Sequence, residues 1–223
     1  AYIKTLLEAN GYTVNTVDST KDDIPEDTDI AVIGAPQTDY MQPDIDKLEK
    51  YMDNGGRQGK QIICFSHAAQ GETPLLDKLL AKYGLKVGEG IVCENREDRY
   101  YNQPYYTLST DISEYLLSEM DVTSPSLLIA QSRPVETVET GNASLDIYKL
   151  CTSSDSGFTA ETQALVNGET KVLKNEKQCY AALSIDQSTG SGIALFGTSS
   201  IAEDQFMAYG QYANKDMMLT LIA

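Results

Sequence analysis

The sequence predicts an α/β fold with a mostly parallel sheet, helices on both of its faces, and an antiparallel extension in the C-terminal half. The continuous apolar run at residues 30–36, and the segment 61–66 with its apolar residues 62–65, are typical of strands that are buried on both faces. Apolar side chains at helical spacing lie between and after these runs, and Gly or Asn-Gly stops end the helices. Strands that alternate with helices through short connections favour parallel pairing.

The first 95 residues supply this alternation. Asn10-Gly11 ends an initial helix, Pro43 occupies the first turn of a second helix, and Thr73 precedes the third as its N-cap. An acidic loop, residues 18–29, leads into the first buried strand. The expected order is helix 1–10, strand 12–17, strand 30–36, helix 43–53, strand 61–66, helix 74–83 and strand 85–92.

The remainder of the chain contains strand signals with few helices between them. We expect one domain over residues 1–223, in which 1–95 form the core, 96–190 an insertion-like antiparallel part, and 191–223 a closing strand and helix. The elements expected after the core are a tyrosine-rich connection 95–106, a short helix 111–120, strands 126–138 and 145–152, an exposed Ser/Thr-rich loop 152–162 that runs into a short helix, a hairpin of 177–185 with 191–197, and a helical stretch 203–222 interrupted near Gly210.

Charge and apolar runs exclude several classes of function. The chain has 17 Lys and Arg against 33 Asp and Glu, a net charge of −16, so its surface repels nucleic acid and anionic lipid. No apolar run approaches the roughly 20 residues of a membrane-spanning helix, and no signal peptide is recognisable. Because residues 1–7 already follow a helical repeat, we expect the chain to be a segment of a longer protein in which a strand comes before this helix.

No metal site and no cofactor are expected. The four cysteines form no C-x-x-C pair, and a single histidine argues against structural zinc. Dinucleotide and P-loop glycine motifs are absent, and the acidic loop lacks the spacing of an EF-hand. Cys64 and Cys93 fit buried apolar positions, whereas Cys151 and Cys179 lie in neighbouring strand candidates and could form a disulfide in an oxidising compartment.

Polar residues that follow the predicted parallel strands form the candidate ligand crevice, because open α/β sheets bind ligands at the carboxyl ends of their strands. The residues expected there are Pro36, Thr38, Tyr40, Ser66, His67, Gln70, Thr198 and Ser199. An enzyme alternative, an amidotransferase-like or esterase-like hydrolase, would use His67 with Ser66 or Ser200. No G-x-S-x-G or G-x-C-x-G elbow surrounds these residues.

The tyrosine-rich connection is a candidate interface, because Tyr and Arg are enriched at protein contacts. Its candidate residues are Arg96, Arg99, Tyr100, Tyr101 and Tyr105. The alternative is a long connection that packs its own aromatic side chains over the sheet. A small-ligand or sugar-binding module that uses the tyrosines is a further hypothesis.

Several motifs resemble the auxiliary domain of bacterial gliding-motility-type (GldG-like) ABC transporter proteins. The motifs are LLEANGYTV at 6–14, IPEDTDIAVIGAP at 24–36, LEKYMDNGG at 48–56, LLDKLLAKYGL at 75–85 and IALFGTSS at 193–200. The resemblance implies a three-layer, flavodoxin-like fold related to class I glutamine amidotransferases, without their catalytic machinery. The sequence departs from the family after Gly197, where such domains often carry an acidic residue.

The resemblance also implies a location and partners. The domain would belong to a membrane-anchored protein and lie outside the cytoplasmic membrane, beside ABC-2 type permease or ATPase components and flanking membrane segments. The leading hypothesis is therefore a non-enzymatic, extracytoplasmic ligand- or partner-binding domain of an ABC-type transport system. A small molecule remains a candidate ligand, and the hydrolase is the alternative.

Overall fold

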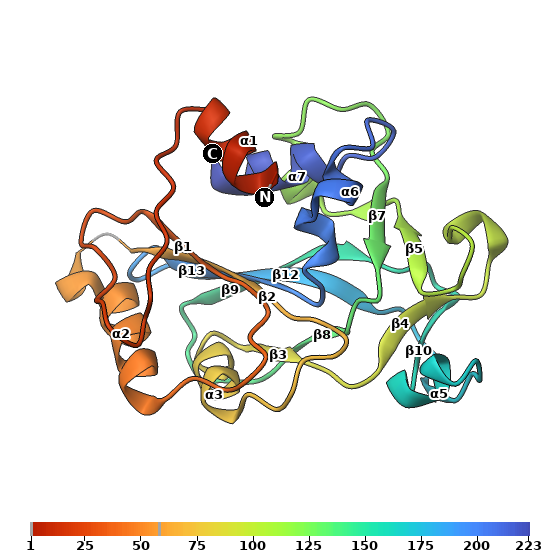
Figure 1. Cartoon of the computed structure of the whole chain (residues 1–223), viewed down its shortest axis with the longest axis horizontal. Coiled ribbons are helices and arrows are strands. Elements are labelled where there is room, and N and C mark those ends of the chain that lie inside the picture. The colour runs from red at the N-terminus through yellow and green to blue at the C-terminus, as the bar shows by residue number, and fades with distance from the viewer. Residues whose placement is uncertain (1, 58) are drawn as a thin grey trace.

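A six-stranded mixed sheet forms the centre of the molecule (Figure 1). The computed structural model describes residues 2–57 and 59–223. In spatial order the strands are β1 (Ile30–Ile33), β2 (Gln61–Phe65), β13 (Ser191–Phe196), β12 (Cys179–Asp186), β9 (Leu145–Thr152) and β6 (Asp111–Ile112). This arrangement confirms the α/β class that the alternating pattern predicted.

The sheet is parallel only in its first three strands. Ile30 pairs with Gln61 between β1 and β2, and Gln61 pairs with Gly192 of β13. Strand β12 runs antiparallel to both β13 and β9, and β6 runs antiparallel to β9. The expectation of a mostly parallel sheet is therefore wrong for the second half, whereas the expected hairpin of β12 and β13 and the antiparallel extension are confirmed.

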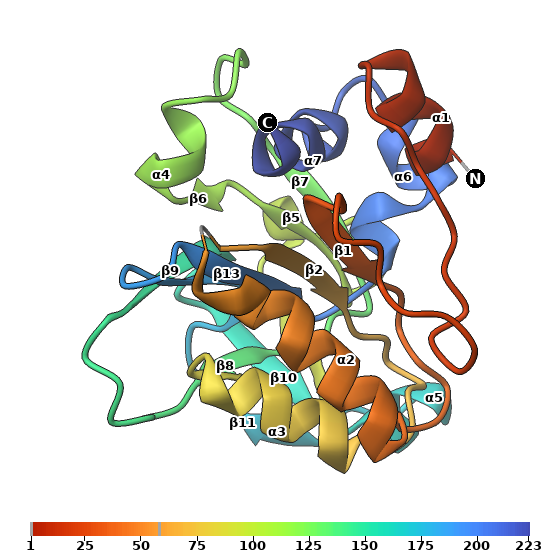
Figure 2. The ribbon, with the colours of Figure 1, turned by 90° about the vertical axis from the view of Figure 1, so that its left-hand side faces the viewer.

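Helices cover both faces of the sheet (Figures 1 and 2). Helices α1 (Tyr2–Ala9), α6 (Asp204–Met207) and α7 (Asn214–Ile222) lie over one face, and α2 (Gln42–Asp53) and α3 (Pro74–Lys82) lie over the other. Side chains along a strand alternate between these layers. In β2, Ile63 and Phe65 belong to the core under α1 and α7, whereas Ile62 and Cys64 pack with α2 and α3.

Helix α2 shows why its own position was predicted correctly. Pro43 lies in its first turn, Asn54 adopts a left-handed backbone at its C-terminal end, and Gly55-Gly56 continue with positive φ through the short 3-10 helix Asn54–Gly56. Its buried face contains Ile45, Leu48, Tyr51 and Met52, at the predicted spacing. The Tyr51 hydroxyl donates to the carbonyls of Asp29 and Gln61, and so ties this face to the ends of β1 and β2.

The predicted strand 85–92 is divided and does not join the central sheet. Strand β3 (Leu85–Val87) pairs with β8 (Val135–Thr137), whereas β4 (Ile91–Glu94) pairs with β10 (Gly157–Ala160), which also pairs with β11 (Val172–Lys174). The break lies at Gly88-Glu89-Gly90, where Gly90 has a φ of 78° and a Cβ would lie 2.5 Å from the Ala160 carbonyl oxygen. Strands β5 (Tyr106–Ser109) and β7 (Leu127–Ala130) form a further two-stranded antiparallel sheet.

Three other local predictions are corrected. Residues 12–17 form no strand, and the Tyr12 hydroxyl instead donates to the Ile222 carbonyl at 3.0 Å. Residues 111–120 form β6 and the short helix α4 (Glu114–Leu117), and 152–162 contain buried β10 before α5 (Thr162–Val166), where an exposed loop was expected. Val32 is 52% exposed, because β1 lies at the edge of the sheet and is not covered on both faces.

All four cysteines are buried and free, so Cys151 and Cys179 form no disulfide. They lie on the neighbouring strands β9 and β12. Burial raises the pKa of Cys64 and of Cys93 to about 12, and that of Cys179 to about 11. These thiols therefore remain protonated at neutral pH and behave as small apolar side chains.

Within residues 2–57 and 59–223, no helix combines the length and the apolar character that crossing a bilayer requires.

Candidate functional site

The carboxyl ends of β1, β2, β13 and β9 lie at the same end of the sheet, because β1 and β2 run parallel to β13, and β9 and β13 both run antiparallel to β12. We use "this edge" for that carboxyl-terminal end. The β7–β8 connection crosses this edge. Its Arg133 N–H donates to the Gly197 carbonyl at 2.9 Å, directly after β13. A Cβ at position 197 would lie 1.9 Å from the Arg133 carbonyl oxygen, so the close approach requires glycine there. The connection therefore holds Arg133 beside the ends of the parallel strands.

A polar cleft of about 470 Å³ opens next to this edge. We use "polar cleft" for the space that lies between the N-terminal end of α3, the loop after β2, the β3–β4 turn and the β7–β8 connection. Its lining residues are Ala68, Gln70, Gly71, Glu72, Thr73, Pro74, Asp77, Glu89, Gly90, Arg133 and Thr162. Three carboxylates and one guanidinium line it, so its net charge is negative.

Among the residues that the structure describes, Arg133 is the only cation that lines the cleft. Its Nε–H donates to the Gly88 carbonyl at 3.1 Å, which orients the half-buried guanidinium. Loss of hydration lowers the pKa of Arg133, and the opposing effect of Asp77 and Glu89 does not offset it. The cationic form is therefore incompletely solvated, and it is positioned by the backbone of the β3–β4 turn.

On the α3 wall of the cleft, a chain of hydrogen bonds positions Asp77. The Gln70 Nε2 amide donates to Thr73 Oγ1 at 3.3 Å, and this hydroxyl donates to Asp77 Oδ1 at 3.2 Å. Desolvation raises the pKa of Asp77, although the bond from Thr73 and the charge of Arg133 act to lower it. The Gln70 Oε1 atom is buried and accepts no hydrogen bond within the described part of the chain.

A carboxylate in the loop between β1 and α2 stabilises the helix that carries Asp77. Asp39 accepts the backbone N–H groups of Leu75 and Leu76, at 2.8 and 3.3 Å. These N–H groups belong to the first turn of α3 and have no partner inside the helix. Asp39 thus serves as the cap, because the Thr73 side chain makes no capping bond and instead serves Asp77.

The predicted crevice residues lie around this edge in different surroundings. Gln70 lines the cleft, whereas the Thr198 hydroxyl donates to the Ala130 carbonyl and that of Ser199 to Glu203. Tyr40 is half-buried, and desolvation raises its pKa. The remaining members, which do not line the cleft, are Pro36, Thr38, Ser66 and His67.

The residues of the hydrolase alternative make separate contacts. His67 Nδ1 accepts the Ala69 backbone N–H at 3.0 Å, a local hydrogen bond within the loop that follows β2. The Ser200 hydroxyl donates to the Ala130 carbonyl at 3.0 Å and accepts the Ala130 N–H. Ser66 Oγ is buried and has no partner among the described residues, so neither serine hydroxyl is hydrogen-bonded to His67.

The tyrosine-rich connection has both an inward and an outward part. Tyr105 packs against the small core of Cys93, Phe158 and Ala160, and Tyr106 packs against the one that contains Phe206. Tyr101 is 56% exposed, and Tyr100 is half-buried. The candidate interface arginines are held locally, Arg96 by Asp98 at 2.6 Å and Arg99 by the Thr110 hydroxyl.

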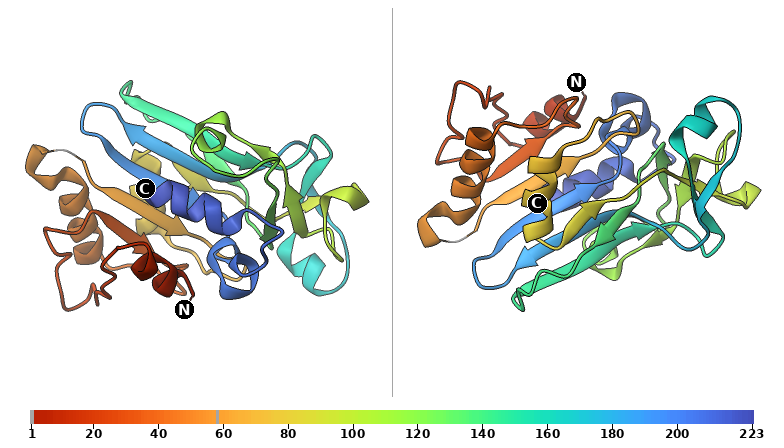
Figure 3. Two further views of the ribbon diagram at one scale, coloured as in Figure 1. Left: turned by 90° about the horizontal axis from the view of Figure 1, so that it is seen from above. Right: turned by 90° about the horizontal axis from the view of Figure 1, so that it is seen from below.

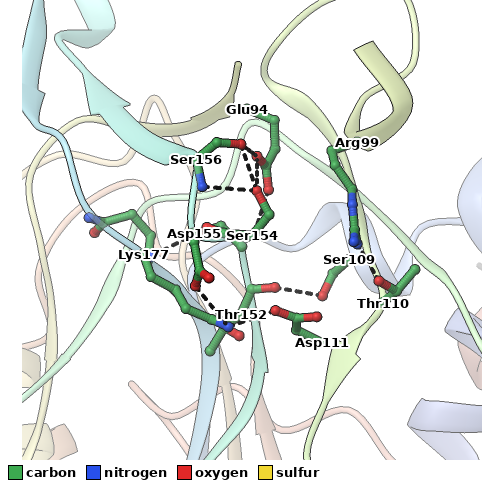
Figure 4. Close-up of polar contacts among 12 residues, drawn as sticks. Glu94, Arg99, Ser109, Thr110, Asp111, Thr152, Ser154, Asp155, Ser156 and Lys177 are labelled. Carbon is green, nitrogen blue, oxygen red and sulfur yellow. Dashed lines mark hydrogen bonds and ion pairs between the residues drawn. The ribbon is translucent and has the colours of Figure 1, made fainter. Parts of the chain in front are cut away.

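A second polar cluster surrounds Glu94 at the end of β4 (Figure 4). Glu94 is 1% exposed; it accepts the Ser154 N–H and hydroxyl at 2.7 Å each, and the Ser156 hydroxyl at 3.3 Å. Lys177 lies nearby between Asp111 and Asp155, at 2.6 and 3.7 Å. Because every oxygen of the buried carboxylate has a donor, this cluster holds the 152–156 segment against β4 and explains why the predicted exposed loop is buried.

Sequence reasoning missed Arg133, Asp77 and Glu94. Asp77 lies four residues after the N-cap candidate Thr73, a spacing that places both side chains on the same side of a first turn. No local signal marks Arg133 or Glu94, because their partners are distant along the chain. Among the described residues, no group of His, Cys, Asp and Glu is arranged to hold a metal ion.

Comparison with known proteins bears on the fold. No protein-family model matches the chain, and no curated protein matches its sequence. Among solved structures, the chain is similar to the mmIFT52 N-terminal domain, with a TM-score of 0.70 and 16% identity. The match covers 99% of this chain and 88% of that one. At this identity the likeness supports the α/β fold over the whole length and carries no function with it.

Proposed function

We propose that this chain is a non-enzymatic, extracytoplasmic ligand- or partner-binding domain of an ABC-type transport system. The observation that carries the binding role is the polar cleft at the carboxyl ends of β2 and β13. Arg133 lines it from the β7–β8 connection and the Asp77–Thr73–Gln70 chain lines it from α3 and the loop after β2, and local hydrogen bonds position these side chains before any ligand arrives. Preorganised, partly desolvated polar groups in a cleft are typical of a binding site.

The proposal includes a relationship of fold and a location. Two helical layers enclose the central sheet, which supports a three-layer, flavodoxin-like arrangement related to class I glutamine amidotransferases. The GldG-like motifs support membership of a membrane-anchored parent protein, with this domain outside the cytoplasmic membrane. Its partners would be ABC-2 type permease or ATPase components and the membrane segments beside it.

The exposed tyrosine of the 95–106 connection provides a contact surface for such a partner. Tyr101 is 56% exposed, whereas its neighbours Tyr105 and Tyr106 anchor the connection to two small cores. An anchored segment that presents a rigid aromatic side chain loses little conformational entropy on binding. Tyr209 is 54% exposed on a different segment and provides a matched control.

Affinity capture from detergent-solubilised membranes tests the proposal, with the tagged chain expressed in the context of its parent protein. Permease or ATPase components should be recovered, and Tyr101→Ser should lower their recovery at least fivefold, whereas Tyr209→Ser should leave it unchanged. Recovery of no transporter component, or equal recovery with both variants, would contradict the assignment.

A further inference from the structure

Two opposite charges face the polar cleft without forming an ion pair. Arg133 lies on the β7–β8 connection and Asp77 on α3, and each affects the pKa of the other. Within residues 2–57 and 59–223, no ion pair joins Arg133 to Asp77 or to Glu89, although all three line the same 470 Å³ space. Each group is therefore close enough to be influenced by the other charge and too far away to be neutralised by contact.

We propose that this cleft binds a small dipolar ligand that carries a carboxylate at one end and an ammonium group at the other. This ligand class rests on the proposed binding function and makes it specific. A ligand with both charges contacts the two walls at once, which neither a simple anion nor a simple cation can do.

The carboxylate end fits Arg133. The Nε–H of Arg133 is engaged by the Gly88 carbonyl, which leaves the terminal nitrogens of the guanidinium as donors toward the cleft. Guanidinium groups bind carboxylates in a bidentate geometry, and such bonds strengthen where hydration is already reduced. Reduced hydration is the condition that lowers the pKa of Arg133.

The ammonium end fits the wall that α3 and the loop after β2 form. Asp77 accepts from Thr73 through one oxygen, Oδ1, and keeps lone pairs for a second donor. Gln70 Oε1 is an acceptor without a partner in the described chain, and Glu72 and Glu89 add negative charge around the opening. An ammonium group offers three donors, which matches a wall made of acceptors.

The distance between the two charges can be measured with a series of ω-amino acids of increasing length. The probes are glycine, β-alanine and γ-aminobutyrate, with acetate and methylammonium as single-charge references. Binding to the purified chain is followed by NMR, through the Arg133 Nε–H and Gly88 amide signals at constant ionic strength. At least one ω-amino acid should bind tenfold or more tightly than both references. The blocked dipeptide acetyl-Lys-Glu-amide distinguishes a free small molecule from a segment of a partner protein.

Variants assign the two ends. Asp77→Asn should reduce the affinity of the preferred ω-amino acid to that of acetate, and Arg133→Met should reduce it to that of methylammonium. Arg96→Met and Asp155→Asn make the same chemical changes at exposed positions outside the cleft and should leave affinity unchanged. Asp77 is exposed on α3, so its variant tests the proposal even if Arg133→Met fails to fold.

Two results would overturn the inference. One is an ω-amino acid series that binds no more tightly than acetate or methylammonium. The other is preferred binding that survives Asp77→Asn and Arg133→Met unchanged. Because the titration uses the isolated chain, these results are independent of transporter capture, so failure of the ligand class and failure of the proposed function are distinguishable.

Discussion

Arg133 and Gly197 are in backbone contact across the edge of the sheet. The Arg133 N–H donates to the Gly197 carbonyl at 2.9 Å, and a Cβ on residue 197 would lie 1.9 Å from the Arg133 carbonyl oxygen. This contact fixes the β7–β8 connection at the end of β13, and with it the cation of the polar cleft.

We expect Gly197→Ala to destabilise the fold by at least about 2 kcal/mol, because the added methyl group meets backbone atoms that cannot move aside. Urea denaturation measures the change. Gly210→Ala is the control, since no atom lies within 4 Å of the Cβ position at that residue. Equal stability of the two variants would show that the connection can shift without cost.

Glu94→Ala should cost about 3 kcal/mol of unfolding free energy, because it leaves the buried Ser154 N–H without an acceptor and removes the carboxylate that accepts from the Ser154 and Ser156 hydroxyls. Glu94→Gln keeps one acceptor oxygen and should cost less. Glu97→Ala, on the exposed turn that follows, should change stability by less than about 0.5 kcal/mol. Chemical denaturation compares the three variants, and a Glu94→Ala protein as stable as Glu97→Ala would refute the structural role.

The pKa of Asp77 should lie above its ordinary value of 3.8, and Arg133→Met should raise it further by removing a favourable charge. Carbon-13 NMR of the side-chain carboxyl measures both pKa values. Because the folded protein then holds this proton more tightly than the unfolded chain, the stabilisation from Asp77 is complete below pH 3.8 and is lost as pH rises through the raised pKa.

The stability difference between the native sequence and Asp77→Asn should follow the same direction. Acidification should favour the native sequence relative to the variant. A pKa of Asp77 that is unchanged or lowered, or one that Arg133→Met does not move, would contradict the desolvated position of this carboxylate.

The four thiols should react slowly with a disulfide reagent in the folded protein, because all are buried and burial raises the pKa of each. After unfolding in denaturant without reductant, all 4 cysteines of the sequence should react. Absorbance of the released thiolate provides the count. Only two reactive thiols after unfolding would indicate a disulfide in the protein.

Helix α2, in the first half of the fold, could be predicted because its information is local. Pro43, the apolar spacing of α2 and the stop at Asn54-Gly55-Gly56 lie within one short segment, and each has the expected role. The β12–β13 hairpin is predictable for the same reason, since Asp186 pairs with Ser191 across a short turn.

The remaining elements depend on residues that are distant in sequence. Whether 85–92 joins the central sheet depends on pairing with β8 and β10, and no pattern inside the segment indicates this choice. The composition of residues 153–156 predicts an exposed segment. Its acceptor is Glu94, which lies 60 residues before Ser154 in the chain, so no local pattern indicates that the segment is held against β4. The residues of the cleft could be predicted only in part for the same reason. Gln70 was predicted at the carboxyl ends of the strands, whereas Arg133 is brought there by its contact with Gly197, which is distant in sequence.

The position of β13 has a consequence for folding during synthesis. This strand lies between β2 and β12, so it joins the strands of the first half of the chain to those of the second (Figure 3). While β12 and β13 are still inside the ribosome, the nascent chain can pair β1 with β2 but cannot connect this pair to β9. The central sheet therefore closes late, and until then the unpaired edges of β2 and β9 are available to chaperones and to other nascent chains.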